Sequence, residues 1–261
     1  MTGHFLAALS AEGRKARRSK VPPLTFAVFT VAAGIGALFM FILRDPERAR
    51  RLGILGQKAQ LSGLTADWAG LLGFLAQVIA VGCLLLFAFI VTWVFGREFA
   101  DGTARYLLAL PVSRTTIVLA KFTLITLWAL ALAGWLIGLV LGVGWLMHLP
   151  GWSADVALDG VGSALIAALL MLLAVAPVAV IACLGRGYLA PLGSALGAMV
   201  VAQIAAVLGW GALVPWSIPA VAAGLAPDAA VGPASLGIIG LTGLAGLIGT
   251  IAWWHSADAG L

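Results

Sequence analysis

Histidine and lysine are the side chains in this sequence best suited to acid-base, metal or phosphate chemistry, and their spacing supports none of these. His4, His148 and His255 are scattered, and no pair has metal-ligand spacing with a cysteine or carboxylate. A phosphate-binding P-loop needs Gly-Lys followed by Ser or Thr, and none of the four lysines follows a glycine. The GxSxG and HExxH motifs are absent. We therefore predict no catalytic, cofactor-binding or metal-binding residues in this chain.

Ionisable groups are also missing from the centres of the long apolar stretches. These hold no Asp, Glu, Arg or His at depth, and Lys121 lies near the end of one stretch. Proton or cation binding inside a bilayer requires such groups, so the pattern argues against a secondary transporter or channel. It argues equally against a membrane-bound lipid-modifying enzyme. Gln77 and Gln203 are the main polar side chains at depth, and hydrogen bonding between helices is favoured over substrate contact for both.

Composition and hydropathy predict an all-α, polytopic membrane helical bundle. Of the 261 residues, 62% are hydrophobic and only 10% are charged, which excludes a water-soluble core. The mean hydropathy is +1.11. About 20 apolar residues cross the hydrocarbon core as a helix. Six segments meet this requirement: 22–43, 69–95, 115–147, 160–184, 191–214 and 234–254.

The distribution of lysine and arginine predicts the orientation of the six-span domain, residues 22–254. Ten basic residues fall on the side of the membrane that holds residues 1–21 and 255–261 in this prediction. Five fall in the first loop, on the opposite side. By the positive-inside rule both termini are cytoplasmic, in the cell inner membrane. The five, Arg44, Arg48, Arg50, Arg51 and Lys58, contradict the rule locally. The net charge of +5 is spread in short runs between apolar stretches, which favours anionic membrane lipid or a partner protein over nucleic acid.

Prolines and glycines mark two further features. Four prolines break the connection 215–233, which is too short to span twice, so we expect an external re-entrant or interfacial helix near 218–226. Two glycine strips occur in the third and last spans, where they either bring helices close together or reflect the general abundance of glycine in membranes. The strips consist of Gly134, Gly138 and Gly142, and of Gly237, Gly240, Gly243, Gly246 and Gly249.

The connection FGREFADGTARYLLALPVSRTTIVLAK, residues 95–121, is the most informative segment. Asp101-Gly102 predicts a turn, and Thr103 can cap a short helix with Tyr106, Leu107 and Leu110 on one face. Pro111 ends that helix, and Ser113 caps the span that begins near Arg114. On physical grounds the short helix is either a membrane-surface helix or a docking element for a partner.

A family resemblance favours docking. The residues Phe95-Gly96-Arg97-Glu98, Asp101-Gly102-Thr103, Leu107-Leu108 and Pro111-Val112-Ser113-Arg114, followed by Lys121, resemble the "FG.E...GT...LL..PVSR......K" pattern of type-2 ABC exporter permeases. Ala11-Glu12, Lys15 and Arg18-Ser19 are similar to the cytoplasmic segment that leads into the first span in the drug, bacteriocin and sodium exporter branches.

The resemblance implies a permease subunit of an ATP-driven exporter for an amphipathic or hydrophobic substrate. Residues 97–113, the coupling segment, would contact a separate P-loop ABC ATPase that binds ATP and Mg, so this chain would not itself be an enzyme. A second permease chain, identical or not, would complete the transporter. Glu98 would pair with the ATPase or serve only as a helix cap or a lipid-interface group. The implied coupling residues are Arg97, Glu98, Asp101, Gly102, Thr103, Arg105, Tyr106, Leu107, Pro111 and Arg114.

Overall fold

The computed structural model describes residues 2–51, 65–109, 111–226 and 229–257, and within these ranges every regular element is a helix. Leu110, Lys58 and most of the loop after the first span lie outside the described residues. Six helical stretches are long and apolar enough to cross a membrane, which confirms the predicted bundle. They are α2 (Val21–Arg44), α4 (Trp68–Ala100), α6 (Arg114–Leu146), α7 with α8 (Ala154–Val175 and Pro177–Leu184), α9 (Leu189–Val207) and α11 (Pro233–Ser256).

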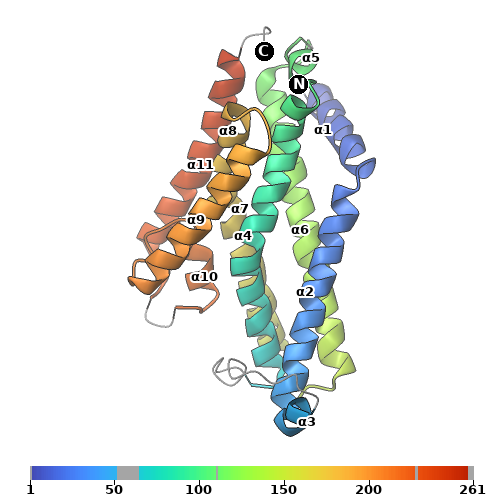
Figure 1. The fold of residues 1–261 in the computed structure, drawn as a ribbon, viewed down its shortest axis with the longest axis vertical. Coiled ribbons are helices and arrows are strands. Elements are labelled where there is room, and N and C mark those ends of the chain that lie inside the picture. The colour runs from blue at the N-terminus through green and yellow to red at the C-terminus, as the bar shows by residue number, and fades with distance from the viewer. Residues whose placement is uncertain (1, 52–64, 110, 227–228, 258–261) are drawn as a thin grey trace.

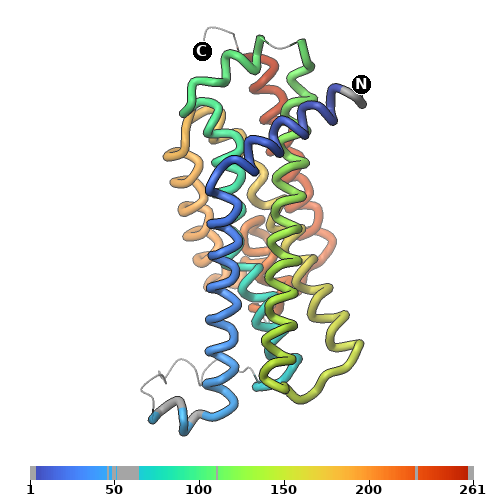
Figure 2. Tube along the Cα trace, turned by 90° about the vertical axis from the view of Figure 1, so that its right-hand side faces the viewer, coloured from blue at the N-terminus to red at the C-terminus, as the bar shows by residue number. Residues whose placement is uncertain are grey.

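Three of the shorter helices mark the two ends of the described bundle. α1 (Thr2–Arg17), α5 (Ala104–Leu108) and the last turn of α11 lie at one end of the bundle, and α3 (Pro46–Arg51) lies at the other (Figure 1). α1 runs obliquely across the upper part of α6 before the chain turns into α2 (Figure 2). The coupling segment therefore shares its end of the molecule with both ends of the described chain.

α4 is the central helix of the bundle. It is the most buried of the spans in the described chain, with Leu75, Ile79, Phe87 and Ile90 among its buried side chains, and it packs beside α7. α9 is the opposite case, because most of its apolar side chains, such as Leu196 and Val200, remain exposed at the outer surface.

The fourth span is broken between α7 and α8 because Pro177 has no backbone N–H to continue the ladder. The indole Nε1 of Trp216 donates to the Ala174 carbonyl oxygen at 3.0 Å, which satisfies one acceptor beside the break. α10 (Ile218–Ala222) follows Trp216 and buries Ile218 and Val221 in the bundle. A short helix therefore forms in the segment expected to be re-entrant or interfacial, and it ends well short of the lower ends of α2 and α4 (Figure 1).

The last span uses part of its glycine strip for close packing. A Cβ at Gly243 would lie 2.7 Å from Leu173, and one at Gly246 would lie 2.5 Å from backbone atoms of Ala176 and Pro177. Gly249 faces Val180 at 3.1 Å. Three members of the strip thus bring α11 against α7 and α8, as small residues allow in membranes. A Cβ at Gly237 or Gly240 would meet no heavy atom within 4 Å.

The strip in the third span makes no close packing within the described chain. A Cβ at Gly134, Gly138 or Gly142 would meet nothing within 4 Å, because these residues lie on the exposed face of α6. The close contact on that helix is at Gly144, whose missing side chain leaves room for the Trp68 ring. The glycine in contact on this helix is therefore not part of the strip, and a helix–helix contact of the strip itself stays a prediction.

Candidate functional site: the coupling segment and its ion cluster

The local structure of the coupling segment follows its sequence. α4 ends at Ala100, and the chain turns at Gly102, whose φ of +67° suits glycine. The predicted short helix forms as α5, and the hydroxyl of Ser113 accepts a hydrogen bond from the Thr116 N–H at 3.1 Å to cap α6. Thr103 precedes α5 but its side chain caps no N–H there, because its hydroxyl is used elsewhere.

Gly96 allows a close approach beneath this segment. A Cβ at Gly96 would lie 2.7 Å from the Gly187 carbonyl oxygen and 3.1 Å from the Tyr188 ring. The turn between α8 and α9 therefore packs directly on the last turns of α4. The glycine of the FG.E pattern thus has a packing reason in this chain.

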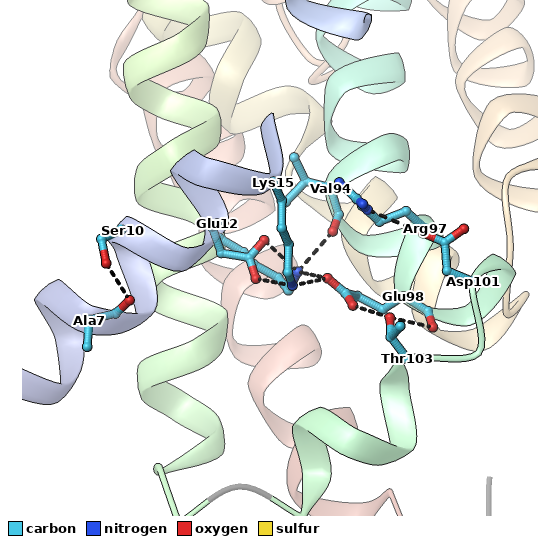
Figure 3. Close-up of polar contacts among 10 residues, drawn as sticks. Ala7, Ser10, Glu12, Lys15, Val94, Arg97, Glu98, Asp101 and Thr103 are labelled. Carbon is cyan, nitrogen blue, oxygen red and sulfur yellow. Dashed lines mark hydrogen bonds and ion pairs between the residues drawn. The ribbon is translucent and has the colours of Figure 1, made fainter. Parts of the chain in front are cut away.

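Glu98 is the centre of a buried ion cluster. Its Oε1 accepts hydrogen bonds from the Lys15 and Lys121 Nζ atoms, each at 2.8 Å. Its Oε2 accepts from the Thr103 hydroxyl at 2.6 Å, and its carbonyl oxygen accepts from the Thr103 N–H at 2.8 Å. The residue is 1% exposed. One carboxylate therefore joins the ion cluster to the residue that begins α5 (Figure 3).

Lys121 lies about two turns inside α6 and has no exposed surface. Its ammonium donates to Glu12 Oε2 at 3.0 Å, to the Val94 carbonyl oxygen at 3.1 Å and to Glu98 Oε1 at 2.8 Å. An ammonium has three donors, so all three are satisfied. The burial of this charge is possible only because two carboxylates and a backbone carbonyl surround it.

α1 supplies the other two charges of the cluster. Glu12 is buried and accepts from Lys121 with one oxygen and from Lys15 Nζ with the other, at 2.8 Å. Partial burial of Lys15 favours the neutral amine, but the Glu12 and Glu98 carboxylates outweigh it and raise the pKa of Lys15 above its ordinary value. With two carboxylates and two ammonium groups, the ion cluster is neutral as a whole.

Two of the predicted coupling residues are engaged inside the chain. Glu98 was expected to pair with an ATPase or to act only as a helix cap or lipid-interface group, but its carboxylate is buried and paired with two lysines, so the pairing across an interface is wrong. Arg114 turns toward the end of α11. Its Nη1 donates to the carbonyl oxygens of Trp254, His255 and Ala257 at 2.8, 3.0 and 2.7 Å. A cation that satisfies the last carbonyls of a helix stabilises its C-terminus.

The remaining predicted residues form a compact surface around α5. Tyr106 is 63% exposed, and Arg105 Nη2 donates to its hydroxyl at 3.3 Å. Leu107 is half-buried against the core, which fixes α5 from below. Arg97 lies over the Trp93 ring at 4.7 Å and 3.6 Å from Asp101 Oδ2. The exposed members are Asp101, Gly102, Arg105, Tyr106 and Pro111.

A separate cavity of about 620 Å³ opens between α4, α9 and α10. Its wall is mostly apolar, and the exposed Gln203 amide lines it without a hydrogen-bond partner among the described residues. The expectation of an interhelical hydrogen bond at Gln203 is therefore wrong in the described chain. Other lining residues include Leu84, Met199, Ala206, Trp216 and Val221. Among the described residues, no group of three or more His, Cys, Asp or Glu side chains could hold a metal ion.

Comparison with known proteins identifies the class. Residues 8–203 match the family described as ABC-2 family transporter protein, and this range includes four whole spans, most of the fifth and the whole coupling segment. The chain therefore belongs to the ABC-2 family of transporter proteins.

A curated relative is similar over part of the chain. The bacitracin transport permease protein BCRB of Bacillus licheniformis is 26% identical over 134 residues, which cover 51% of this chain and 64% of that protein. The chain thus matches somewhat less than two thirds of the relative's length.

Sequence reasoning missed the ion cluster, although each member stood out separately. Lys121 interrupts an apolar helix, and a buried ammonium must find carboxylates. Glu12 and Lys15 lie three residues apart in α1, so both can face the same side. What the sequence could not show is that α1 folds back across α6 to bring them to Glu98.

Proposed function

We propose that this chain is the membrane-spanning subunit of an ATP-driven exporter, with both termini in the cytoplasm of the cell inner membrane. A separate P-loop ATPase binds the exposed surface of Asp101, Arg105, Tyr106 and Pro111, and a second permease chain completes the transport path. The observation that carries the proposal is the construction of this surface. A short helix with an exposed aromatic residue and mixed charges stands on a buried ion cluster, which suits a rigid docking element.

The docking surface can be tested by reversing the charge of two exposed arginines, one on the surface and one at the opposite end of the bundle. Arg105→Glu and Tyr106→Ala change the proposed surface, whereas Arg51→Glu makes the same charge change on an exposed residue at the opposite end of the bundle. With a P-loop ATPase that co-purifies with the unmodified chain, we expect complex yield to fall at least threefold for the first two variants and to remain unchanged for Arg51→Glu. Equal yields for all three, or ATP hydrolysis by the purified permease alone, would overturn the proposal.

The substrate proposal rests on the cavity. Its size and apolar wall suit an amphipathic or hydrophobic molecule, and Gln203 offers one polar contact at depth. Because a relative is a bacitracin transport permease, bacitracin is the first compound to test.

We expect Ala206→Phe, which fills the cavity, to reduce efflux, and Val200→Phe on the outer face of the same helix to leave efflux unchanged. Efflux should be compared at matched complex yield. If the two variants transport alike, the cavity is not the substrate path.

A further inference from the structure

The ion cluster joins three segments that lie far apart in the sequence. Glu12 and Lys15 come from α1, Glu98 from the last turn of α4, and Lys121 from α6. Figure 3 shows Glu12 and Lys15 approaching Glu98 from α1, with Thr103 bonded to the other oxygen of the same carboxylate. The start of α5 and the last turn of α1 are thus connected through the Glu98 side chain.

The ion cluster is also the polar attachment of α1 to the rest of the molecule. Among the described residues, every side-chain hydrogen bond from α1 to another element involves Glu12 or Lys15. The other cations of this region, Arg14, Arg17 and Arg18, are exposed. α1 is therefore positioned by two charged residues together with the packing of small apolar groups such as Ala16.

Because separating these charges is unfavourable, a displacement of one charged residue moves its partners with it. Glu12, Glu98 and Lys121 are nearly or wholly buried, so moving one away from its partner leaves an uncompensated buried charge. A rigid connection of this kind moves as a unit, as packed elements do in hinge and shear transitions.

We propose that Glu98 and Lys121 are positioning residues that make α1 part of the coupling element. A displacement of α5 passes through Thr103 and Glu98 to Lys15, and hence to α1 and the start of α2. This inference rests on the proposed ATPase docking at the coupling segment. It assigns α1 a mechanical role beyond that surface.

The first test needs no ATPase. In the purified chain, Lys121→Met keeps a long unbranched side chain but leaves two carboxylates with one lysine. We expect amide hydrogen exchange in α1 to accelerate at least tenfold, while exchange in the middle of α4 stays as in the unmodified chain. Arg14→Gln, an exposed change on the same helix, should leave exchange in α1 within twofold of the unmodified chain.

A double variant separates loss of the link from simple misfolding. Lys121→Met with Glu12→Gln leaves the neutral Lys15–Glu98 pair, so protection of α1 should return in part. If Lys121→Met does not fold, Lys15→Met serves instead, because Lys15 retains 29% side-chain exposure and its loss is milder. Unchanged exchange in α1 in every variant that folds would overturn the proposal.

The second test measures coupling in the complex with the ATPase. For Glu98→Gln at matched complex yield, we expect bacitracin exported per ATP hydrolysed to fall at least fivefold, with hydrolysis itself retained. If Glu98 had a purely structural role, Glu98→Gln would lower bacitracin export and ATP hydrolysis together, because less complex would form. An unchanged ratio with a loosened α1 would refute the mechanical role. If the unmodified chain binds no ATPase, the proposed function fails and this role with it, whereas the exchange data still report the attachment of α1.

Discussion

Gly246 offers the sharpest test of how the last span is held. A Cβ at this position would lie 2.5 Å from the backbone of Ala176 and Pro177, about 0.9 Å inside ordinary van der Waals contact. Backbone atoms cannot rotate away, so Gly246→Ala must push α11 from the break between α7 and α8. Gly240→Ala is the matched control, because its Cβ would meet nothing within 4 Å on the same helix.

Two opposing contributions set the change in the free energy of unfolding for each variant. Alanine is favoured over glycine inside a helix by about 1 kcal/mol, and both variants gain this. Overpacking costs about 1–3 kcal/mol, and only Gly246→Ala incurs it. Since the clash is with backbone, we take the upper part of that range, about 2–3 kcal/mol, as the difference between the variants. For a chain of this size the difference corresponds to about 4–12 °C in melting temperature.

The assay is thermal unfolding of the purified chain in detergent, followed by size-exclusion chromatography of each variant after heating. Gly246→Ala should melt below the unmodified chain, and Gly240→Ala should melt at or above it. Equal melting temperatures for the two variants would show that α11 does not pack on the α7–α8 break as described.

Two other predictions concern the cap of α6 and the orientation. Ser113→Ala removes the hydroxyl that accepts from the Thr116 N–H and should cost about 1 kcal/mol of stability in the same melting assay, whereas Ser113→Thr should retain most of it; equal losses would argue against the cap. In a background lacking Cys83 and Cys183, Ala229→Cys should react with an impermeant reagent in intact cells and Arg105→Cys should not; labelling of Arg105→Cys would reverse the orientation.

The spans were predictable because their signal is local and strong. A run of about 20 apolar residues has few structural options, and all six expected segments coincide with helices in the structure. The largest error was in the fifth span, expected over 191–214, which ends as α9 at Val207 before the turn at Gly209. An apolar sequence continued past the helix, so hydropathy alone did not mark its end.

The candidate site was predictable in location but not in its connections. Local turn and cap chemistry indicated α5 and the Ser113 cap, because these depend on neighbouring residues. The pairing of Glu98 depends on α1, 83 residues earlier, and that distance leaves no local pattern. Glu98 resembled a surface charge because α4 ends two residues after it. Only the fold shows that the end of α4 lies beneath α1.

The unequal lengths of the spans bear on the surrounding lipid. α9 has 19 residues and is about 28 Å long, whereas α4 and α6 have 33 residues each and reach about 50 Å. A hydrocarbon core of about 30 Å matches α9 and is exceeded by its neighbours, and the tilt of α9 shortens its reach further (Figure 1). Membrane thickness therefore affects the tilt of α9 more than that of α4, although both helices line the cavity. A thicker bilayer favours an upright α9, and a thinner one favours the tilt seen here.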